Sequence, residues 1–151
     1  VLTKEGEVLA IPAKALELGY RTSVIPKNGW IVLGAVLQLK KGDPEQILAR
    51  MEELKEQRIT KQPLDLPSAG STFKRPDGYF AGKLIMDAGL RGFTVGGAQV
   101  SEKHCGFVVN RGDATAADVW ELICEVKRRV KERTGVELEL EVKLLGDFPQ
   151  R

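Results

Sequence analysis

The sequence is poor in the residue types that many metal, redox and disulfide sites depend on. It contains one histidine, His104, and two cysteines, Cys105 and Cys124, which lack the C-x-x-C spacing of zinc and redox motifs. Both cysteines stand in apolar surroundings, so we expect buried, reduced thiols and neither a disulfide nor a metal site. Reduced thiols fit a cytoplasmic protein.

The sequence also lacks the motifs of nucleotide-binding loops and of serine hydrolases. Neither G-x-x-x-x-G-K-[ST] nor G-x-G-x-x-G occurs, which argues against a P-loop and a dinucleotide fingerprint. The single histidine stands in no G-x-S-x-G setting, so a nucleophilic serine would have no evident base. A hydrolase is therefore disfavoured.

Charge and hydrophobic runs exclude two further classes. The net charge is +2, from 23 basic and 21 acidic residues, without the clustered basic stripe of nucleic-acid-binding proteins. No apolar run reaches the roughly 18 residues of a membrane span, so we expect neither nucleic acid nor membrane insertion. What is present is an ordinary globular composition, 151 residues of which 42% are hydrophobic, enough for one domain or slightly more.

Periodicity predicts a mixture of helices and strands. Helical spacing and capping signals predict helices in "DPEQILARMEELKEQR", "YFAGKLIMDAG" and "ATAADVWELICEVKRRVKERTG", the last beginning with a Thr115–Asp118 capping box. Strands are predicted in "GWIVLGAVLQLKKG", covered on both faces, and in "FTVGGAQV", "CGFVVN" and "VELELEVKLLG". Prolines and glycines predict an irregular linker over 60–78. Without repeated strand-helix units, this pattern indicates an α+β fold, a mixed or antiparallel sheet packed with helices.

The beginning of the sequence, "VLTKEGEVLAI", has neither an initiator methionine nor the layout of a signal peptide. It reads as two short apolar runs around a Glu-Gly turn. We therefore expect a fragment of a longer protein, one that need not keep its parent's activity.

The linker contains "PSAGSTFKRP", which places Ser71 in a Gly-Ser-Thr turn before two basic residues. Serine hydroxyls commonly cap the amides of turns, and this is the more frequent role of a serine in such a place. The residues alone do not decide between a structural and a chemical role.

Several stretches, in order along nearly the whole chain, resemble one family, the UDP-N-acetylenolpyruvoylglucosamine reductases (MurB). They are "LGYRTSV", "WIVLGAVLQLKKG", "PSAGSTFKRP", "AGKLIMDAGLRGFTVGGAQVSEKHCGFVVN", "GDATAADV" and "GVELELEVKLLG". The shorter form of the family, which lacks an extra tyrosine loop, is the more similar. The resemblance implies that residues 1–60 are the C-terminal remnant of an FAD-binding half and that 61–151 are a substrate-binding domain.

The resemblance also implies a reaction. In this family NADPH reduces bound FAD, which then reduces UDP-N-acetylglucosamine enolpyruvate to UDP-N-acetylmuramate for peptidoglycan synthesis. The matching positions make Arg21, Ser71 and Glu141 catalytic, with Ser71 as the proton donor to a substrate carbon and the other two beside the substrate carboxylate.

The remaining family positions are binding positions. The substrate-binding residues would be Lys74, Arg75, Arg91 and His104, and Gly70 would let the backbone approach the flavin. Most of the FAD site would lie upstream of this sequence.

Structural or surface roles remain alternative interpretations for these residues. Glu141 is one of three glutamates that alternate with apolar residues, Arg21 could be a surface cation, and His104 could begin a strand. Arg75 stands where other members carry asparagine, which leaves its contact with a diphosphate open. A non-catalytic module that binds nucleotide sugars, built on the same scaffold, is the alternative function.

Overall fold

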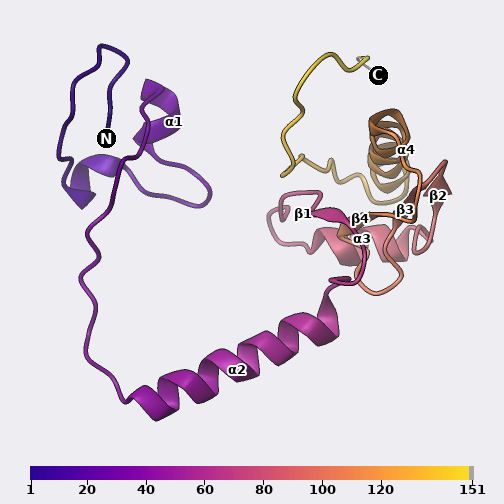
Figure 1. Ribbon diagram of the computed structural model, residues 1–151. Helices are drawn as coiled ribbons and strands as arrows, with labels where there is room; N and C mark the ends of the chain where they lie inside the picture. Colours follow the sequence, from indigo (N-terminus) through magenta and orange to yellow (C-terminus); the bar gives the residue numbers. More distant parts are fainter. Residues whose placement is uncertain (150–151) are drawn as a thin grey trace. The chain divides into compact units, whose positions relative to one another are not determined.

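The computed structural model describes residues 1–149 and divides the chain into two compact units, Val1–Asp43 and Pro44–Arg151 (Figure 1). Unit 1 begins with a small hairpin-like turn, in which Leu2 bridges both Val8 and Ile31. It continues with the short 3-10 helix η1, Ala13–Leu16, and α1, Val24–Asn28. The side chain of Ser23 caps α1 by accepting a hydrogen bond from the Ile25 amide at 3.2 Å.

Unit 2 starts with a long amphipathic helix, α2, Pro44–Lys61. The helix is confirmed, but its apolar stripe is exposed: Ile47 is 49% accessible, Leu48 64% and Met51 60%. The last turn of α2 contacts the loop that contains Lys103, whose ammonium donates to the Ile59 carbonyl oxygen at 2.7 Å.

The rest of unit 2 is a four-stranded antiparallel sheet covered by helices, which confirms the α+β class (Figure 1). The strands are β1 (Ser68–Ser71), β2 (Thr94–Val95), β3 (Ala98–Val100) and β4 (Phe107–Asn110), in the spatial order β1-β4-β3-β2. Helix α4, Ala116–Thr134, contacts β2 and β3, and α3, Ala81–Asp87, contacts α4.

The core lies between α4 and the sheet. Fully buried side chains of α4, Leu122, Ile123, Val126 and Val130, pack with residues from the sheet, from α3 and from the segment after α4. The predicted capping box is confirmed, since Thr115 Oγ1 accepts from the Asp118 amide at 3.1 Å and the Asp118 carboxylate accepts from the Thr115 amide at 2.8 Å. Gly135, with φ +73°, ends the helix.

Two predicted strands are wrong in this structure. The segment 32–42 is extended but forms no strand, and Val36 and Leu39 are almost fully exposed. In the C-terminal segment 136–146, Leu138 is fully buried, yet the segment makes only one bridge, between Phe73 and Leu140. A strand exists only where a neighbour supplies hydrogen bonds, and apolar alternation cannot show whether that neighbour is there.

Two further predictions need correction in the sheet. The linker predicted over 60–78 contains β1, because residues 68–71 find a partner in β4 despite the surrounding prolines and glycines. The segment "FTVGGAQV" is two strands, β2 and β3, in which Val95 pairs with Ala98 across a Gly96-Gly97 turn. Gly96 has φ +52°, a conformation that other residues rarely adopt.

Candidate functional site

The candidate site is built around β1, where a bulge precedes Ser71. Ser68 pairs with Val109 and Ser71 with Phe107, so the register shifts between the two pairs. Gly70 lies within the bulge at φ +86°, which explains the need for glycine there. A bulge bends its strand and redirects side chains, and Ser71 is exposed at the end of the bulged strand.

Thr72, which follows Ser71, is buried and connects three segments. Its amide donates to the Gly106 carbonyl oxygen at 2.8 Å, and its hydroxyl accepts from the Val108 amide at 3.0 Å. Its own carbonyl oxygen accepts from the Glu141 amide at 3.0 Å. The backbone of Glu141 is thereby held next to the residue that follows Ser71.

Lys74 extends this pairing between 72–74 and 139–142. The Lys74 amide donates to the Glu139 carbonyl oxygen at 2.8 Å, and its ammonium lies 2.9 Å from a Glu139 carboxylate oxygen. The hydrogen bond and charge of Glu139 raise the pKa of Lys74, with a smaller contribution from the charge of Glu141, and the same pairing lowers the pKa of Glu139. An acidic group therefore already holds the lysine predicted to meet a diphosphate.

Arg75 is held by its own loop. Its Nε donates to the Tyr79 carbonyl oxygen at 3.3 Å, and the guanidinium carbon lies 4.0 Å from the ring centroid of Phe80. This stacking limits the orientations of an exposed, planar cation. The guanidinium is therefore held against its own loop, at the surface.

His104 and Arg91 meet the same loop, residues 101–106. The Nδ1 atom of His104 accepts from the Gly106 amide at 3.1 Å, and its ring makes an edge contact with Phe107, with centroids 5.1 Å apart. The Nη1 atom of Arg91 donates to the Glu102 carbonyl oxygen at 3.0 Å. Burial raises the pKa of the intervening Cys105 thiol, against the opposing charge of Arg91.

Arg21 lies in unit 1, in a tight turn closed by hydrogen bonds between Gly19 and Thr22. Its φ of +58° is unusual for a residue other than glycine, and its guanidinium carbon lies 5.8 Å from the Tyr20 ring centroid. Ser71, Lys74, His104 and Glu141 all come from neighbouring segments of unit 2. The placement of Arg21 beside them stays a prediction.

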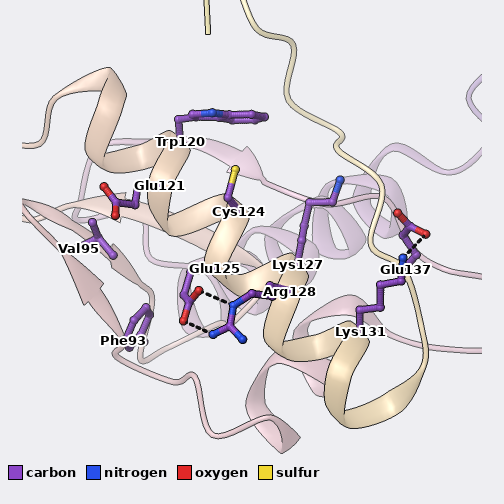
Figure 2. Close-up of a pocket in the computed structure, with 10 residues that line it drawn as sticks. All are labelled: Phe93, Val95, Trp120, Glu121, Cys124, Glu125, Lys127, Arg128, Lys131 and Glu137. Atoms are coloured by element: carbon purple, nitrogen blue, oxygen red, sulfur yellow. Dashed lines mark hydrogen bonds and ion pairs between the residues drawn. The ribbon is translucent and has the colours of Figure 1, made fainter. Parts of the chain in front are cut away.

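Three cavities in unit 2 are lined by residues that the structure describes. One of about 470 Å³ lies between Pro67–Ala69, the end of β4 and the start of α4. Another, of about 500 Å³, is lined by Lys74, Lys127 and residues 137–140. The third, of about 680 Å³, lies along α4, and its lining includes the rings of Trp120 and Phe93 and the Glu125–Arg128 and Lys131–Glu137 pairs (Figure 2).

Sequence reasoning missed two residues of this region. Thr72 carries no motif of its own, and its role depends on contacts with three distant segments. The alternating segment predicts only an outward-facing glutamate at position 139, but Glu139 is the ion-pair partner of Lys74. That alternation placed Glu139 at the surface and could not indicate which cation it meets.

Within residues 1–149, no three histidine, cysteine, aspartate or glutamate side chains gather as a metal site would require. Over the same residues, no helix combines the length and the apolar character needed to cross a membrane.

Residues 62–145 match the family model described as "UDP-N-acetylenolpyruvoylglucosamine reductase, C-terminal domain". The chain is 63% identical over 147 residues to the reductase of that name from Lachnoclostridium phytofermentans, and 54% identical to that from Clostridioides difficile. These matches cover 97% of this chain but 47% and 48% of the relatives, so the chain spans about half the length of the curated relatives it matches.

A crystal structure of the reductase (MurB) from Thermus caldophilus resembles the fold. It matches with a TM-score of 0.68 and 44% sequence identity, over 85% of this chain and 46% of that one. The sequence motifs, the antiparallel α+β fold and the matching domain lead to one conclusion. The chain belongs to the UDP-N-acetylenolpyruvoylglucosamine reductase family and contains its C-terminal domain.

Proposed function

We propose that this chain is the substrate-binding part of an oxidoreductase that reduces UDP-N-acetylglucosamine enolpyruvate to UDP-N-acetylmuramate, with NADPH as reductant and FAD as cofactor. The protein would act in the cytoplasm, in the synthesis of peptidoglycan precursors. The observation that carries the proposal is the hydrogen bond from the Glu141 amide to the Thr72 carbonyl oxygen, which brings the two predicted catalytic residues of unit 2 onto adjacent segments.

The bulge in β1 fits a flavin close to the backbone. A Cβ added to Gly70 would meet no other atom within 4 Å, so open space borders the chain at this point. Ala69 and Gly70 would lie beside the FAD. The chemistry that FAD supplies when bound is hydride transfer from NADPH to the enolpyruvyl double bond.

Ser71 would give a proton to the substrate carbon that becomes basic when hydride reaches its neighbour. A serine hydroxyl is a weak acid in water, so this role needs a site from which water is excluded when substrate binds. Three hydrogen bonds fix Thr72, so the backbone next to Ser71 is held in place. A fixed backbone favours a Ser71 hydroxyl that points at one substrate carbon.

Arg21 and Glu141 would lie at the substrate carboxylate. Negative charge moves onto this group as hydride arrives, and preorganised donors lower the energy of that state. The charge of Lys74, close enough for Glu141 to affect its pKa, would add to the positive field there.

The diphosphate would meet Lys74, Arg75 and Arg91, and His104 would contact other polar groups of the substrate. Arg75, oriented by the Phe80 ring, offers paired donors to phosphate oxygens. Lys74 has three donors, so it can bind a phosphate oxygen while keeping Glu139. Because the diphosphate takes no part in the reaction, these contacts would stabilise the bound substrate and the transition state equally.

A chimera tests the function. The chain, joined to the N-terminal part of the L. phytofermentans reductase, should oxidise NADPH beyond the one equivalent that reduces its FAD only when the enolpyruvyl substrate is present. A chimera that takes up FAD and binds the UDP-sugar, yet leaves NADPH unoxidised, would favour the non-catalytic binding module.

A further inference from the structure

His104 begins a tight turn, residues 104–107, that its own side chain helps to close. The Phe107 amide donates to the His104 carbonyl oxygen at 3.0 Å, and the Gly106 amide donates to the Nδ1 atom of His104 at 3.1 Å. The hydroxyl of the buried Ser101 accepts from the His104 amide at 3.2 Å. The backbone and the ring of His104 are therefore both held in this turn.

The ring of His104 lies close against two glycines. A Cβ added to Gly106 would lie 2.9 Å from the Cε1 atom of His104, closer than real Cβ contacts come. A Cβ added to Gly82, in the first turn of α3, would lie 3.4 Å from the same atom. The glycine at 106 thus leaves room for the ring at the place where Nδ1 meets the amide.

The hydrogen bond from Gly106 selects one protonation state of the ring. A neutral imidazole has one donor and one acceptor nitrogen, whereas an imidazolium has two donors. Because Nδ1 accepts, the ring is neutral and its proton is on Nε2. Nε2 is then the polar ring atom left for a substrate contact, and the group that it meets must be a hydrogen-bond acceptor.

The same turn carries partners of Ser71 and Thr72. The Gly106 carbonyl oxygen accepts from the Thr72 amide at 2.8 Å. Phe107 is the residue of β4 that pairs with Ser71 after the bulge in β1. The position of Ser71 therefore depends on the shape of the 104–107 turn.

We propose that His104 is a positioning residue: its neutral ring, with the proton on Nε2, holds the 104–107 turn in the shape that places Ser71 and Thr72. A small displacement of a reacting group is enough to slow a reaction strongly, so a loosened turn should impair proton donation by Ser71. The consequence for the Ser71 reaction rests on the proposed function, whereas the state of the ring and the shape of the turn do not.

Two substitutions separate this role from direct contact with the substrate. His104→Asn keeps an acceptor oxygen near the place of Nδ1 and removes the Nε2 donor. His104→Gln keeps a donor near the place of Nε2 and removes the Nδ1 acceptor. Lys103→Ala is the matched control, because this neighbouring side chain reaches the Ile59 carbonyl oxygen of α2 instead.

The first measurement uses the chain alone, without a histidine tag, so that nitrogen-15 spectra report on its single histidine. In slightly alkaline buffer the pyrrole-like signal should come from Nε2 and the pyridine-like signal from Nδ1. The Gly106 and Thr72 amides should exchange hydrogen about tenfold or more faster in His104→Gln than in wild type. Their exchange should stay near the wild-type rate in His104→Asn and in Lys103→Ala. Circular dichroism checks that the variants fold, and the wild-type spectrum tests the protonation state without any variant.

The second measurement uses the chimera with the N-terminal part of the L. phytofermentans reductase. His104→Gln should slow oxidation of the reduced FAD by the enolpyruvyl substrate by about tenfold or more, with reduction by NADPH unchanged. His104→Asn should keep the rate of this oxidative step and raise KM, because it loses only a donor to the substrate.

Three results would overturn the positioning role. One is a wild-type ring with its proton on Nδ1. Another is unchanged exchange of the Gly106 and Thr72 amides in His104→Gln. The third is an oxidative step that His104→Asn slows as much as His104→Gln does. A chimera that never oxidises NADPH, while the two amides respond as expected, would instead count against the proposed function alone.

Discussion

The Thr72 hydroxyl accepts from the Val108 amide inside the sheet, 36 residues away in sequence. Thr72→Val keeps the shape of the side chain but leaves this buried amide without an acceptor. We expect the free energy of unfolding to fall by about 1–3 kcal/mol. Urea titration measures the change, with Thr60→Val, on the exposed surface of α2, as the control. A loss below that of the control would mean that the Val108 amide finds another partner.

Ser71 gives the sharpest test of the proposed mechanism. In the chimera with the N-terminal part, Ser71→Ala should leave reduction of FAD by NADPH intact and slow the oxidative half-reaction by about a hundredfold or more. Ser71→Cys should restore part of the rate, since a thiol offers a proton from nearly the same place. Thr60→Ala, on the exposed surface of α2, is the control. Stopped-flow traces that show a normal oxidative half-reaction in Ser71→Ala would exclude the proton-donor role.

The predictability of the site differs from residue to residue. Ser71 and Glu141 were singled out through family motifs, and the structure brings their segments together. The roles proposed for these residues are still predictions. The ion pair between Lys74 and Glu139 could not be foreseen, because it joins residues 65 positions apart whose proximity depends on the completed fold.

At the scale of elements, helices were more predictable than strands. The signals of α4 are local: its capping box, its apolar spacing and Gly135 all lie within the helix or beside it. The strand predicted over residues 29–42 depended instead on a partner elsewhere, as did β1, which the prolines and glycines around it concealed. Local sequence does not contain this information.

Helix α4 also carries a pH-sensitive ion-pair network. Hydrogen bonds from Arg128, and then from Arg129, lower the pKa of Glu125 to about 2, and its side chain is 24% exposed. Because the folded pKa lies below the unfolded value, the network stabilises the fold above about pH 4.5 and ceases to do so as pH falls through about 2.

Glu125→Gln should therefore lower the free energy of unfolding by roughly 0.5–1 kcal/mol at pH 7, a size typical of partly exposed helix pairs. The difference from wild type should shrink below about pH 4. Thermal unfolding at several pH values measures it. Glu132→Gln, which removes a more exposed partner of Arg128, should cost less. A difference that persists unchanged down to pH 2 would exclude the ion pair as its source.

At the scale of the whole molecule, the extended segment 32–42, at the end of unit 1, should be the first point of proteolysis. Lys40 and Lys41 are exposed and lie where the backbone makes no hydrogen bonds. Brief trypsin treatment should cut there before any site in α4 and leave a product beginning at Lys41 or Gly42. Mass spectrometry identifies the product. Earlier cleavage after Arg128 or Lys131 would show that α4 opens more readily than this segment.

The hydrogen bonds of Thr72 to distant segments affect the kinetics of folding. Its contacts close long loops, to Val108 and to Glu141, whereas α4 and the β2–β3 turn form from residues near one another in sequence. Long loops cost more entropy to close, so short-range structure forms before them. The candidate site should thus assemble after the folding barrier, and substitutions at Thr72 should hasten unfolding while leaving the refolding rate nearly unchanged.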